Sequence, residues 1–444
     1  MRHMTPPEAR PPDTHSLSTI PSPEGLVLTP FRALRYTTGS GPELARVTSP
    51  PYDVIDEDER RELEASDPHN VVRLILPRDG ATGTGGAYRR AADTLRDWRA
   101  AGVLAVDPRP GLYVYEMDDQ VHPTRGLVGA LELATPEANI VLPHENTMAG
   151  TVADRLALTE ATEANLEPIY LVYGGGGAAS QVVADQDAVS PLVEATTADG
   201  ITHRVWAVTE PDTLAAIAAD LRPRRAVIAD GHHRYATYLR HQADQHARGL
   251  GPGPWDRGLV LLVDSSTYGP QVHAIHRVVP DLPLHQAVAA ARSGFTVEAV
   301  AGRAQALEAL ARGPRPSFLL TDGADWYLVG APDRGQLAEA LPTERSAAWR
   351  ALDVTVAHRF LITRLWAVPD TEDVVGYRHD VQAAIDAVAP TGGTALLLNP
   401  TPVDEVISVA AAGERMPRKS TLFTPKPRTG LVLRAFADSS RDSG

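Results

Sequence analysis

The chain has 444 residues, a length that accommodates two or three domains with separate hydrophobic cores. Its 56 acidic and 42 basic residues give a formal net charge of -14, which repels nucleic acids at long range. We therefore expect no nucleic-acid partner, and a phosphate site must be made locally by a few basic side chains and backbone N–H groups. The sequence contains no cysteine, which excludes disulfides, thiolate catalysis and cysteine-bound zinc.

The two ends of the sequence carry few apolar residues. Residues 1–26 are rich in Pro, Ser and Thr and lack the apolar segment of a secretion signal, so we expect a disordered leader. Residues 435–444 are mostly polar and are expected to be frayed. No stretch of the sequence approaches the roughly 18 consecutive apolar residues that a membrane span needs. These features favour a cytoplasmic protein without a membrane partner, and they leave the oligomeric state open.

The first elements are expected in the region that begins at residue 27. The run Val71–Leu76 is apolar, contains β-branched residues and lies between turn signals, which predicts a buried strand. Apolar residues at helical spacing from Tyr88 to Trp98 predict a helix, and Gly102 suits the left-handed position after it. Alternating side chains predict strands at 112–116 and 127–133.

Further along the chain, strand-like and helical runs alternate. A short strand at Ala226–Ala229 leads directly into Asp230, and a helix follows. Beyond it, strand-like runs at 259–263, 318–320 and 395–398 alternate with helical runs at 284–292, 347–366 and 381–388. This mixture predicts an α/β or mixed α+β fold.

The sequence Asp230-Gly231-His232-His233-Arg234 stands where the predicted strand turns into a helix. Backbone N–H groups at a helix N-terminus lack acceptors, and the helix dipole favours negative charge there. Gly231 allows a tight turn, the histidines add donors, and the Arg234 guanidinium suits a bidentate phosphate contact. Asp230 is expected to orient a histidine or to hold Mg²⁺ against the phosphates. The alternative is that Asp230 only caps the helix and that the histidines are ordinary surface residues.

A second polar segment, Pro143-His144-Glu145-Asn146-Thr147, follows the apolar pair Val141-Leu142. Glu145 is a candidate general base, which would take the proton of an attacking hydroxyl as phosphate is transferred. The polar residues near it are then expected to contact the substrate, namely His144, Asn146, Thr147 and Arg155. The alternative is that Glu145 is merely solvated.

The third cluster, Met416–Thr429, holds four basic residues and four hydroxyls within 14 positions of an acidic chain. Such a segment is typical of a phosphate clamp, although a solvated basic loop is the other interpretation. Gly413 with Lys419-Ser420 resembles a P-loop, but Arg418 replaces its second glycine and Pro417 removes an N–H that the loop would need. We therefore reject a P-loop.

Taken together, these motifs resemble those of the DUF1015 family of bacterial and archaeal proteins, from about residue 26 to residue 434. The resemblance is carried by motifs in five places: Pro30-Phe31-Arg32-Ala33, Pro51-Tyr52-Asp53-Val54-Ile55, His144-Glu145, Asp230 to Tyr235, and Lys419-Ser420-Thr421. More distantly, the order of the last three is similar to that of free-serine kinases of the ParB/sulfiredoxin-like superfamily. About 85 residues separate Glu145 from Asp230, more than a compact ParB-like unit needs, which implies an insertion.

The resemblance implies a ParB/sulfiredoxin-like nucleotide-binding core at 27–258, with insertions, and we expect a C-terminal α/β domain at 259–434. It implies that Glu145 is the catalytic base, that Gly231 to Arg234 contact nucleotide phosphates, and that Lys419, Ser420 and Thr421 lie on the phosphate side. We add His233 as a second catalytic residue and Asp230 as a metal and phosphate-side residue.

The expected activity is transfer of phosphate from ATP or ADP, with Mg²⁺, to the hydroxyl of serine or a related amino acid. The alternative is a ParB-like nucleotide-binding or nucleotide-hydrolysing regulator without a small-molecule acceptor. A sulfiredoxin activity is excluded because the chain has no cysteine. A chromosome-partitioning role fits poorly with the acidic charge.

Overall fold

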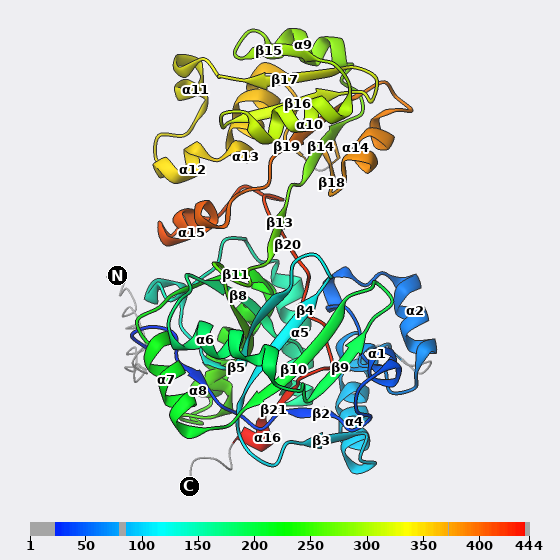
Figure 1. Ribbon diagram of the computed structural model, residues 1–444, viewed down its shortest axis with the longest axis vertical. Helices are drawn as coiled ribbons and strands as arrows, with labels where there is room; N and C mark the ends of the chain where they lie inside the picture. Colours follow the sequence, from blue (N-terminus) through cyan, green and yellow to red (C-terminus); the bar gives the residue numbers. More distant parts are fainter. Residues whose placement is uncertain (1–22, 80–85, 372, 440–444) are drawn as a thin grey trace, which may run out of the picture.

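A computed structural model describes residues 23–79, 86–371 and 373–439. Most of the expected leader and half of the expected tail, 1–22 and 440–444, therefore lie outside the described residues. The chain forms a larger and a smaller lobe, joined by the antiparallel strands β13 (Gln271–His273) and β20 (Leu422–Thr424) (Figure 1). Within the described ranges, no helix is both long enough and apolar enough to cross a membrane.

The larger lobe is built on a mixed nine-stranded sheet. Its strands, in spatial order, are β6 (Val141–Leu142), β11 (Ala226–Asp230), β8 (Ile169–Tyr173), β12 (Arg257–Asp264), β5 (Thr124–Glu132), β4 (Leu112–Asp118), β10 (Thr202–Val208) and β9 (Val193–Thr196), and β1 (Leu28–Thr29) pairs with β5. The pairs β6–β11 and β8–β12 are parallel, whereas the other pairs are antiparallel. The sheet therefore combines both strand directions.

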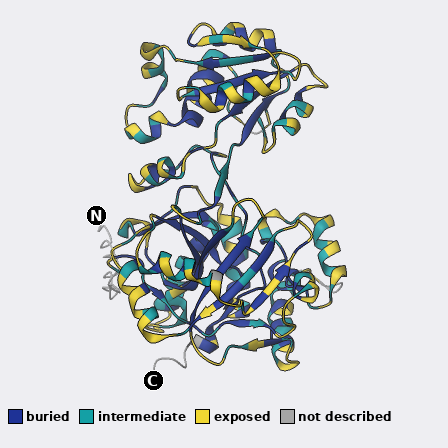
Figure 2. Ribbon diagram, in the orientation of Figure 1, coloured by how far each residue is buried: buried dark blue, intermediate teal, exposed yellow. Residues whose placement is uncertain are grey.

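Helices cover both faces of this sheet, so its central strands are largely buried (Figure 2). Successive side chains of a strand point to opposite faces. In β12, Leu259, Leu261 and Val263 enter one core, and Val260 and Leu262 enter the other. The first core is covered by α1 (Pro42–Val47), α3 (Val72–Ile75), α4 (Ala87–Ala100) and α5 (Ala149–Thr162), and the second by α6 (Ala178–Ala184), α7 (Pro211–Leu221) and α8 (His232–Ala247).

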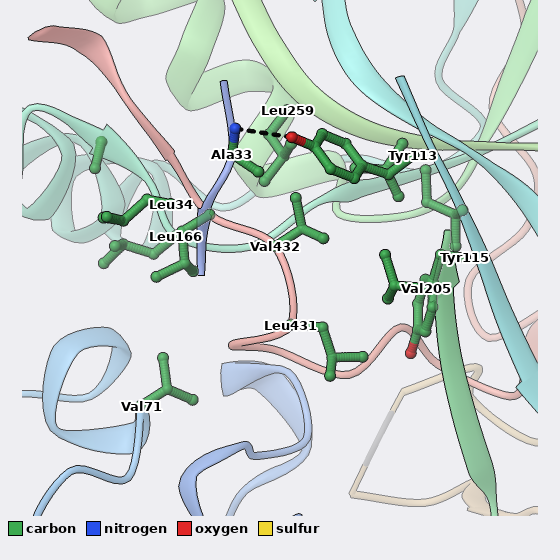
Figure 3. Close-up of a cluster of buried hydrophobic side chains, with 14 of the residues drawn as sticks. Ala33, Leu34, Val71, Tyr113, Tyr115, Leu166, Val205, Leu259, Leu431 and Val432 are labelled. Carbon is green, nitrogen blue, oxygen red and sulfur yellow. Dashed lines mark hydrogen bonds between the residues drawn. The ribbon is translucent and has the colours of Figure 1, made fainter. Parts of the chain in front are cut away.

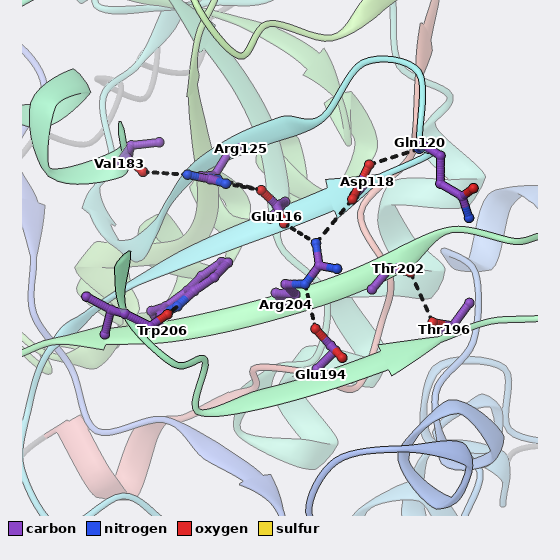
Figure 4. Close-up of polar contacts among 11 residues, drawn as sticks. Glu116, Asp118, Gln120, Arg125, Val183, Glu194, Thr196, Thr202, Arg204 and Trp206 are labelled. Atoms are coloured by element: carbon purple, nitrogen blue, oxygen red, sulfur yellow. Dashed lines mark hydrogen bonds and ion pairs between the residues drawn. The ribbon is translucent and has the colours of Figure 1, made fainter. Parts of the chain in front are cut away.

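Shorter elements complete the larger lobe. They are α2 (Glu57–Ser66), the pair β2 (Leu34–Tyr36) and β3 (Leu104–Val106), the pair β7 (Ala164–Asn165) and β21 (Arg434–Ala435), and α16 (Phe436–Ser439). Figure 3 shows part of the first core, where the Tyr113 hydroxyl accepts a hydrogen bond of 3.1 Å from the Ala33 N–H. Arg204 of β10 lies among three carboxylates, those of Glu116 and Asp118 on β4 and of Glu194 on β9, so its charge is compensated (Figure 4).

The segment Val71–Leu76 forms a helix, so the prediction of a strand was wrong. The helix α3 spans Val72–Ile75, and the Asn70 side-chain oxygen accepts a hydrogen bond of 2.9 Å from the Val72 N–H at its start. The Asn70 amide also donates to the carbonyls of Arg46 and Thr48. An apolar run that is buried on all sides carries no period that separates strand from helix. The asparagine bonds decide the outcome.

The smaller lobe is built on a six-stranded sheet in which every described pair of neighbours is antiparallel. Its strands, in spatial order, are β15 (Thr296–Val300), β17 (Trp326–Gly330), β16 (Ser317–Thr321), β19 (Thr394–Leu398), β14 (His276–Val279) and β18 (Gly376–Arg378). Its helical elements are α9 (Leu284–Ala291), α10 (Arg303–Arg312), α11 (Arg334–Ala340), α12 (Ala347–Ala351), α13 (Asp353–Val356), the π-helix Ala357–Leu365 and α14 (Val381–Val388). Alternation again divides two cores, since Phe318 and Leu320 face one and Leu319 faces the other.

The two sheets divide the chain differently from the expected boundary at residue 259. That position lies inside β12, which pairs with β5 and β8 in the larger sheet. The last part of the chain also returns to the larger lobe, where β21 pairs with β7. Between the lobes lies α15 (Val403–Ala411), and its Val406 packs in one cluster with Leu142 of β6 and Val227 of β11. The overall class is mixed α/β, as the sequence indicated.

Candidate functional site

The parallel strands β6 and β11 bring together two motifs that lie far apart in the sequence. Parallel neighbours end at the same edge of a sheet, so the segments after Leu142 and after Ala229 become adjacent. The His144 N–H donates a hydrogen bond of 3.2 Å to His232 Nε2, and the two imidazole rings meet edge to face at 4.6 Å. Because its Nε2 accepts this bond, a neutral His232 carries its proton on Nδ1. Pro143–Thr147 and Asp230–Arg234 therefore form one site.

Gly231 is the N-cap of α8 and has a φ of 93°. Glycine adopts this left-handed conformation without the clash that a side chain would cause, and a Cβ here would lie 3.2 Å from the Arg234 guanidinium. No side chain among the described residues caps the first turn of α8, so Asp230 is not a helix cap. The N–H groups of this turn are therefore available to an anion.

Glu145 lies beside this helix end, with 45% of its side chain exposed. Its carboxylate is 3.7 Å from His232 Nδ1 and 3.9 Å from His144 Nε2. Partial burial and the negative charge of Asp230 raise the pKa of Glu145, whereas Lys419 and Lys426 oppose the rise. A carboxyl with a raised pKa is a stronger proton acceptor once ionised, which suits a general base.

Lys426 belongs to the third predicted cluster but was assigned no role of its own, yet it contacts two acidic residues of the site. Its amine is 2.9 Å from Asp53 Oδ2 and 2.7 Å from Asp230 Oδ1. The two carboxylates raise the pKa of Lys426 against the opposing effect of burial, and the lysine thus stays charged. Asp53 is presented by the 3₁₀ helix Tyr52–Val54, in the stiff turn after Pro50-Pro51.

A signal for both basic residues is present in the sequence. Lys419 and Lys426 are the only two lysines of the chain, whose other basic charges are all arginines. Lysine offers a compact charge with three rotatable donors, whereas arginine offers a planar fork, so the two are not interchangeable at a binding site. Because lysine occurs only in this one segment, the composition indicates that the segment has a specific binding role.

Two arginines of the expected site are turned toward the protein. Arg234 is 6% exposed, pairs with Asp230, and donates to the carbonyl of Pro168. Arg155 is equally buried, donates to the carbonyl of Ile75, and lies 4.3 Å from the ring centre of Tyr52. Their guanidinium groups therefore support the site from within, which differs from the expected phosphate and substrate contacts.

The third expected cluster joins the site from the C-terminal segment. The Thr421 hydroxyl is 3.0 Å from His144 Nε2, and the Lys419 side chain is exposed. The Ser420 hydroxyl instead donates to the Pro417 carbonyl, and its side chain is buried, so it does not face the open side. Asn146 and Thr147 are exposed.

His233, the second expected catalytic residue, is partly buried at the start of α8. Its Nε2 accepts a hydrogen bond of 3.1 Å from the Met148 N–H. Burial lowers the pKa of His233, so the ring is neutral near pH 7. This contact ties α8 to the start of α5, and the ring holds two helix ends together.

The residues present do not form the expected magnesium site. Both carboxylate oxygens of Asp230 are bound to cations, one to Lys426 and one to Arg234. Among residues 23–79, 86–371 and 373–439, no group of three His, Asp or Glu is arranged as a metal site. Mg²⁺ prefers free oxygen ligands in octahedral geometry, which Asp230 does not offer in this arrangement.

A cleft of about 540 Å³ adjoins the site at Tyr52. Its described lining includes Gly150 and Thr151, from the first turn of α5, together with the partly exposed Asp154 and the buried Arg155, which form an ion pair. No side chain among the described residues caps α5, so this second helix N-terminus also opens toward the cleft. The cleft is thus shared by Tyr52, which neighbours Asp53 of the site, and by the start of α5.

Comparison with solved structures gives several distant matches. A free serine kinase in complex with AMP is 15% identical, with 66% of this chain and 88% of that chain covered and a TM-score of 0.30. SbnI with C-terminal truncation, from Staphylococcus aureus, is 13% identical over 68% of this chain and 87% of that chain, with a TM-score of 0.34. At such TM-scores the likeness assigns no function to this chain.

The family is defined by sequence. Comparison with curated proteins gives no match. The model of the family described as "Protein of unknown function (DUF1015)" matches residues 28–355, well over half of the chain. This match covers all strands of the larger sheet and the His144-Glu145 and Asp230–Arg234 motifs. The chain belongs to the DUF1015 family.

Proposed function

We propose that this chain binds a nucleotide by its phosphates and transfers one of them to the hydroxyl of a small molecule. The observation that carries the proposal is the position of Glu145, a carboxylate of raised pKa, beside an uncapped helix N-terminus and two lysines. A base next to an anion site is the arrangement that phosphoryl transfer to a hydroxyl needs, since that reaction depends on positioning and charge stabilisation.

In this mechanism the N–H groups after Gly231 bind the phosphate chain. Glu145 takes the proton of the acceptor hydroxyl while a bond forms between the hydroxyl oxygen and the transferred phosphorus. The bond from that phosphorus to the bridging oxygen of the donor breaks, so ATP leaves as ADP, or ADP as AMP. Lys419 and Lys426 neutralise charge that develops on the transferred group. Because the residues of the site do not form a magnesium ligand set, no step is assigned to a metal.

The acceptor class follows from the order of the motifs. The sequence Pro-His-Glu, then Asp-Gly-His-His-Arg, then a late basic and hydroxyl segment resembles the order in free-serine kinases, so serine or a related hydroxy amino acid is the first choice. Of the expected substrate contacts, Asn146 and Thr147 are exposed next to Glu145, whereas His144 and Arg155 are buried. The exposed Asn146 and Thr147 are therefore the two expected contacts that an acceptor beside Glu145 could reach.

The test is phosphate transfer from ATP or ADP to a panel of hydroxy amino acids. We expect acceptor-dependent consumption of nucleotide, and a loss of about 10²- to 10⁴-fold in Glu145→Gln. Glu344→Gln, an exposed glutamate of the smaller lobe, is the matched control and should behave like the unchanged protein. Nucleotide hydrolysis that does not respond to any acceptor would favour the regulator. Full activity of Glu145→Gln would exclude the proposed base.

A further inference from the structure

Lys419 reaches the site from a segment that the smaller lobe holds. Its backbone has a φ of 53°, a left-handed conformation that is uncommon for residues with side chains. Such a conformation persists where surrounding contacts fix it. The neighbouring Ser420 carbonyl accepts a hydrogen bond of 3.2 Å from Thr401, a residue that follows β19 of the smaller lobe.

Arg277, on β14, makes the direct contact with Lys419. Its side chain is almost fully buried, at 1% exposure, and its Nη2 donates a hydrogen bond of 2.9 Å to the Lys419 carbonyl. Its Nη1 donates to the Ile275 carbonyl, and its Nε donates to His358 Nε2 at 2.9 Å. Burial lowers the pKa of Arg277 to about 10, which still leaves it charged at neutral pH. Burying a guanidinium is unfavourable unless its donors are satisfied, as they are here.

His358 and Asp370 fix the orientation of Arg277. Because His358 Nε2 accepts from Arg277, a neutral His358 carries its proton on Nδ1, which lies 2.9 Å from Asp370 Oδ1. The same Asp370 oxygen accepts a hydrogen bond of 2.8 Å from Arg418, the residue before Lys419. One carboxylate therefore holds the Lys419 segment twice, once through Arg418 and once through the His358–Arg277 pair.

We infer that Asp370, His358 and Arg277 are positioning residues that hold Lys419 at the phosphate site. The smaller lobe thereby completes a site whose other residues lie on the larger lobe. On the far side of Lys419 the chain enters that lobe at once, where Thr421 contacts His144. The inference rests on the proposed function, because it assigns Lys419 a phosphate to bind.

A double-mutant cycle with ADP as the probe separates positioning from simple stability. Isothermal titration should show that Asp370→Asn weakens ADP binding about tenfold and that Lys419→Ala weakens it at least as much. If Asp370 acts through Lys419, the double variant binds no more weakly than Lys419→Ala alone. The matched control is Asp353→Asn, because Asp353 is a buried carboxylate of the same lobe that pairs with Arg315 and should leave the affinity unchanged. An equal loss from Asp370→Asn with and without Lys419 would overturn the inference.

A second measurement needs no nucleotide. Since the chain has only two lysines, reductive methylation with ¹³C-formaldehyde gives two lysine signals in an NMR spectrum, which Lys419→Arg and Lys426→Arg assign. Asp370→Asn should shift the Lys419 signal and leave that of Lys426 in place. An unmoved Lys419 signal would contradict positioning. If the unchanged protein does not bind ADP while the Lys419 signal shifts, the positioning stands and the proposed function fails.

Discussion

The larger and the smaller lobe differ in strand direction, and this difference explains where the site lies. In the larger sheet the parallel pair β6–β11 ends at one edge, so His144 and His232 come into contact there. In the smaller sheet all described neighbours are antiparallel, so paired strands end at opposite edges. A parallel pair collects two loops at one place. The smaller lobe instead contributes support, through the contact of Arg277 with the Lys419 carbonyl.

The largest effect tests whether the lobes are separate folding units. Phe360 is fully buried in the smaller lobe, with its ring centre 5.0 Å from that of Phe295. Phe360→Ala leaves a cavity and should lower the free energy of unfolding of this lobe by about 3–5 kcal/mol. Urea unfolding should then show two transitions, and only the transition of the smaller lobe should shift to a lower urea concentration. A single transition that shifts as a whole would mean that the lobes unfold together.

The next effect concerns charge at the site of the larger lobe. Lys426→Met leaves Asp53 and Asp230 without the amine between them, and the transferred phosphate without a cation. We expect phosphate transfer to fall about hundredfold. The measurement is the rate of phosphate transfer in Lys426→Met. The control is Arg303→Met, which removes an exposed cation of the smaller lobe. Transfer rates within a few-fold of each other would remove Lys426 from the site.

The response to acid should be shared by both lobes, since each contains a buried neutral histidine. Burial lowers the pKa of His144, in the larger lobe, to about 4, and that of His276, in the smaller lobe, also to about 4. The unfolded chain binds these protons at a pKa of about 6.5, so it holds more protons than the folded chain between pH 6.5 and 4. Stability is therefore complete above pH 6.5 and falls below it, by up to about 1.4 kcal/mol per pH unit for each histidine.

Urea unfolding at a series of pH values measures this slope. His276→Asn should flatten the slope for the smaller lobe and leave that of the larger lobe unchanged. Equal slopes in the variant and the unchanged protein would contradict the assignment to His276.

The smallest effects compare two helix starts. Gly231→Ala places a side chain in a left-handed conformation, which should cost about 1–2 kcal/mol of stability. The variant should also weaken ADP binding, because the added Cβ meets the Arg234 guanidinium, which supports the first turn of α8 from within.

In the smaller lobe, Ser346 caps α12 by accepting a hydrogen bond of 3.1 Å from the Trp349 N–H. Ser346→Ala should cost about 1 kcal/mol and leave ADP binding unchanged. Thermal unfolding and ADP titration of both variants test the contrast.

The motifs that meet at the candidate site could be located from the sequence because each of them is local. Gly231 before two histidines, directly after an apolar strand, indicates a helix start that faces an anion. The role of Arg234 could not be predicted, because its hydrogen-bond partner is the carbonyl of Pro168, a residue 66 positions away that directly precedes β8. Asp53 was a weak signal for the same reason, since only its contact with Lys426, which lies 373 residues away, shows that it belongs to the site.

The sequence by itself determined the mixed class, the strand before Asp230, the helix after it and the polar segment around Glu145, because periodicity and turn residues act over a few neighbours. Tertiary structure alone decided that Val71–Leu76 is helical, that Asp230 serves two cations, and that Lys419 depends on the smaller lobe. Each outcome depends on a contact with a distant segment: Asn70 with the carbonyls of Arg46 and Thr48, Asp230 with Lys426, and Lys419 with the buried Arg277. Local patterns carry no information about which distant group will meet a given side chain.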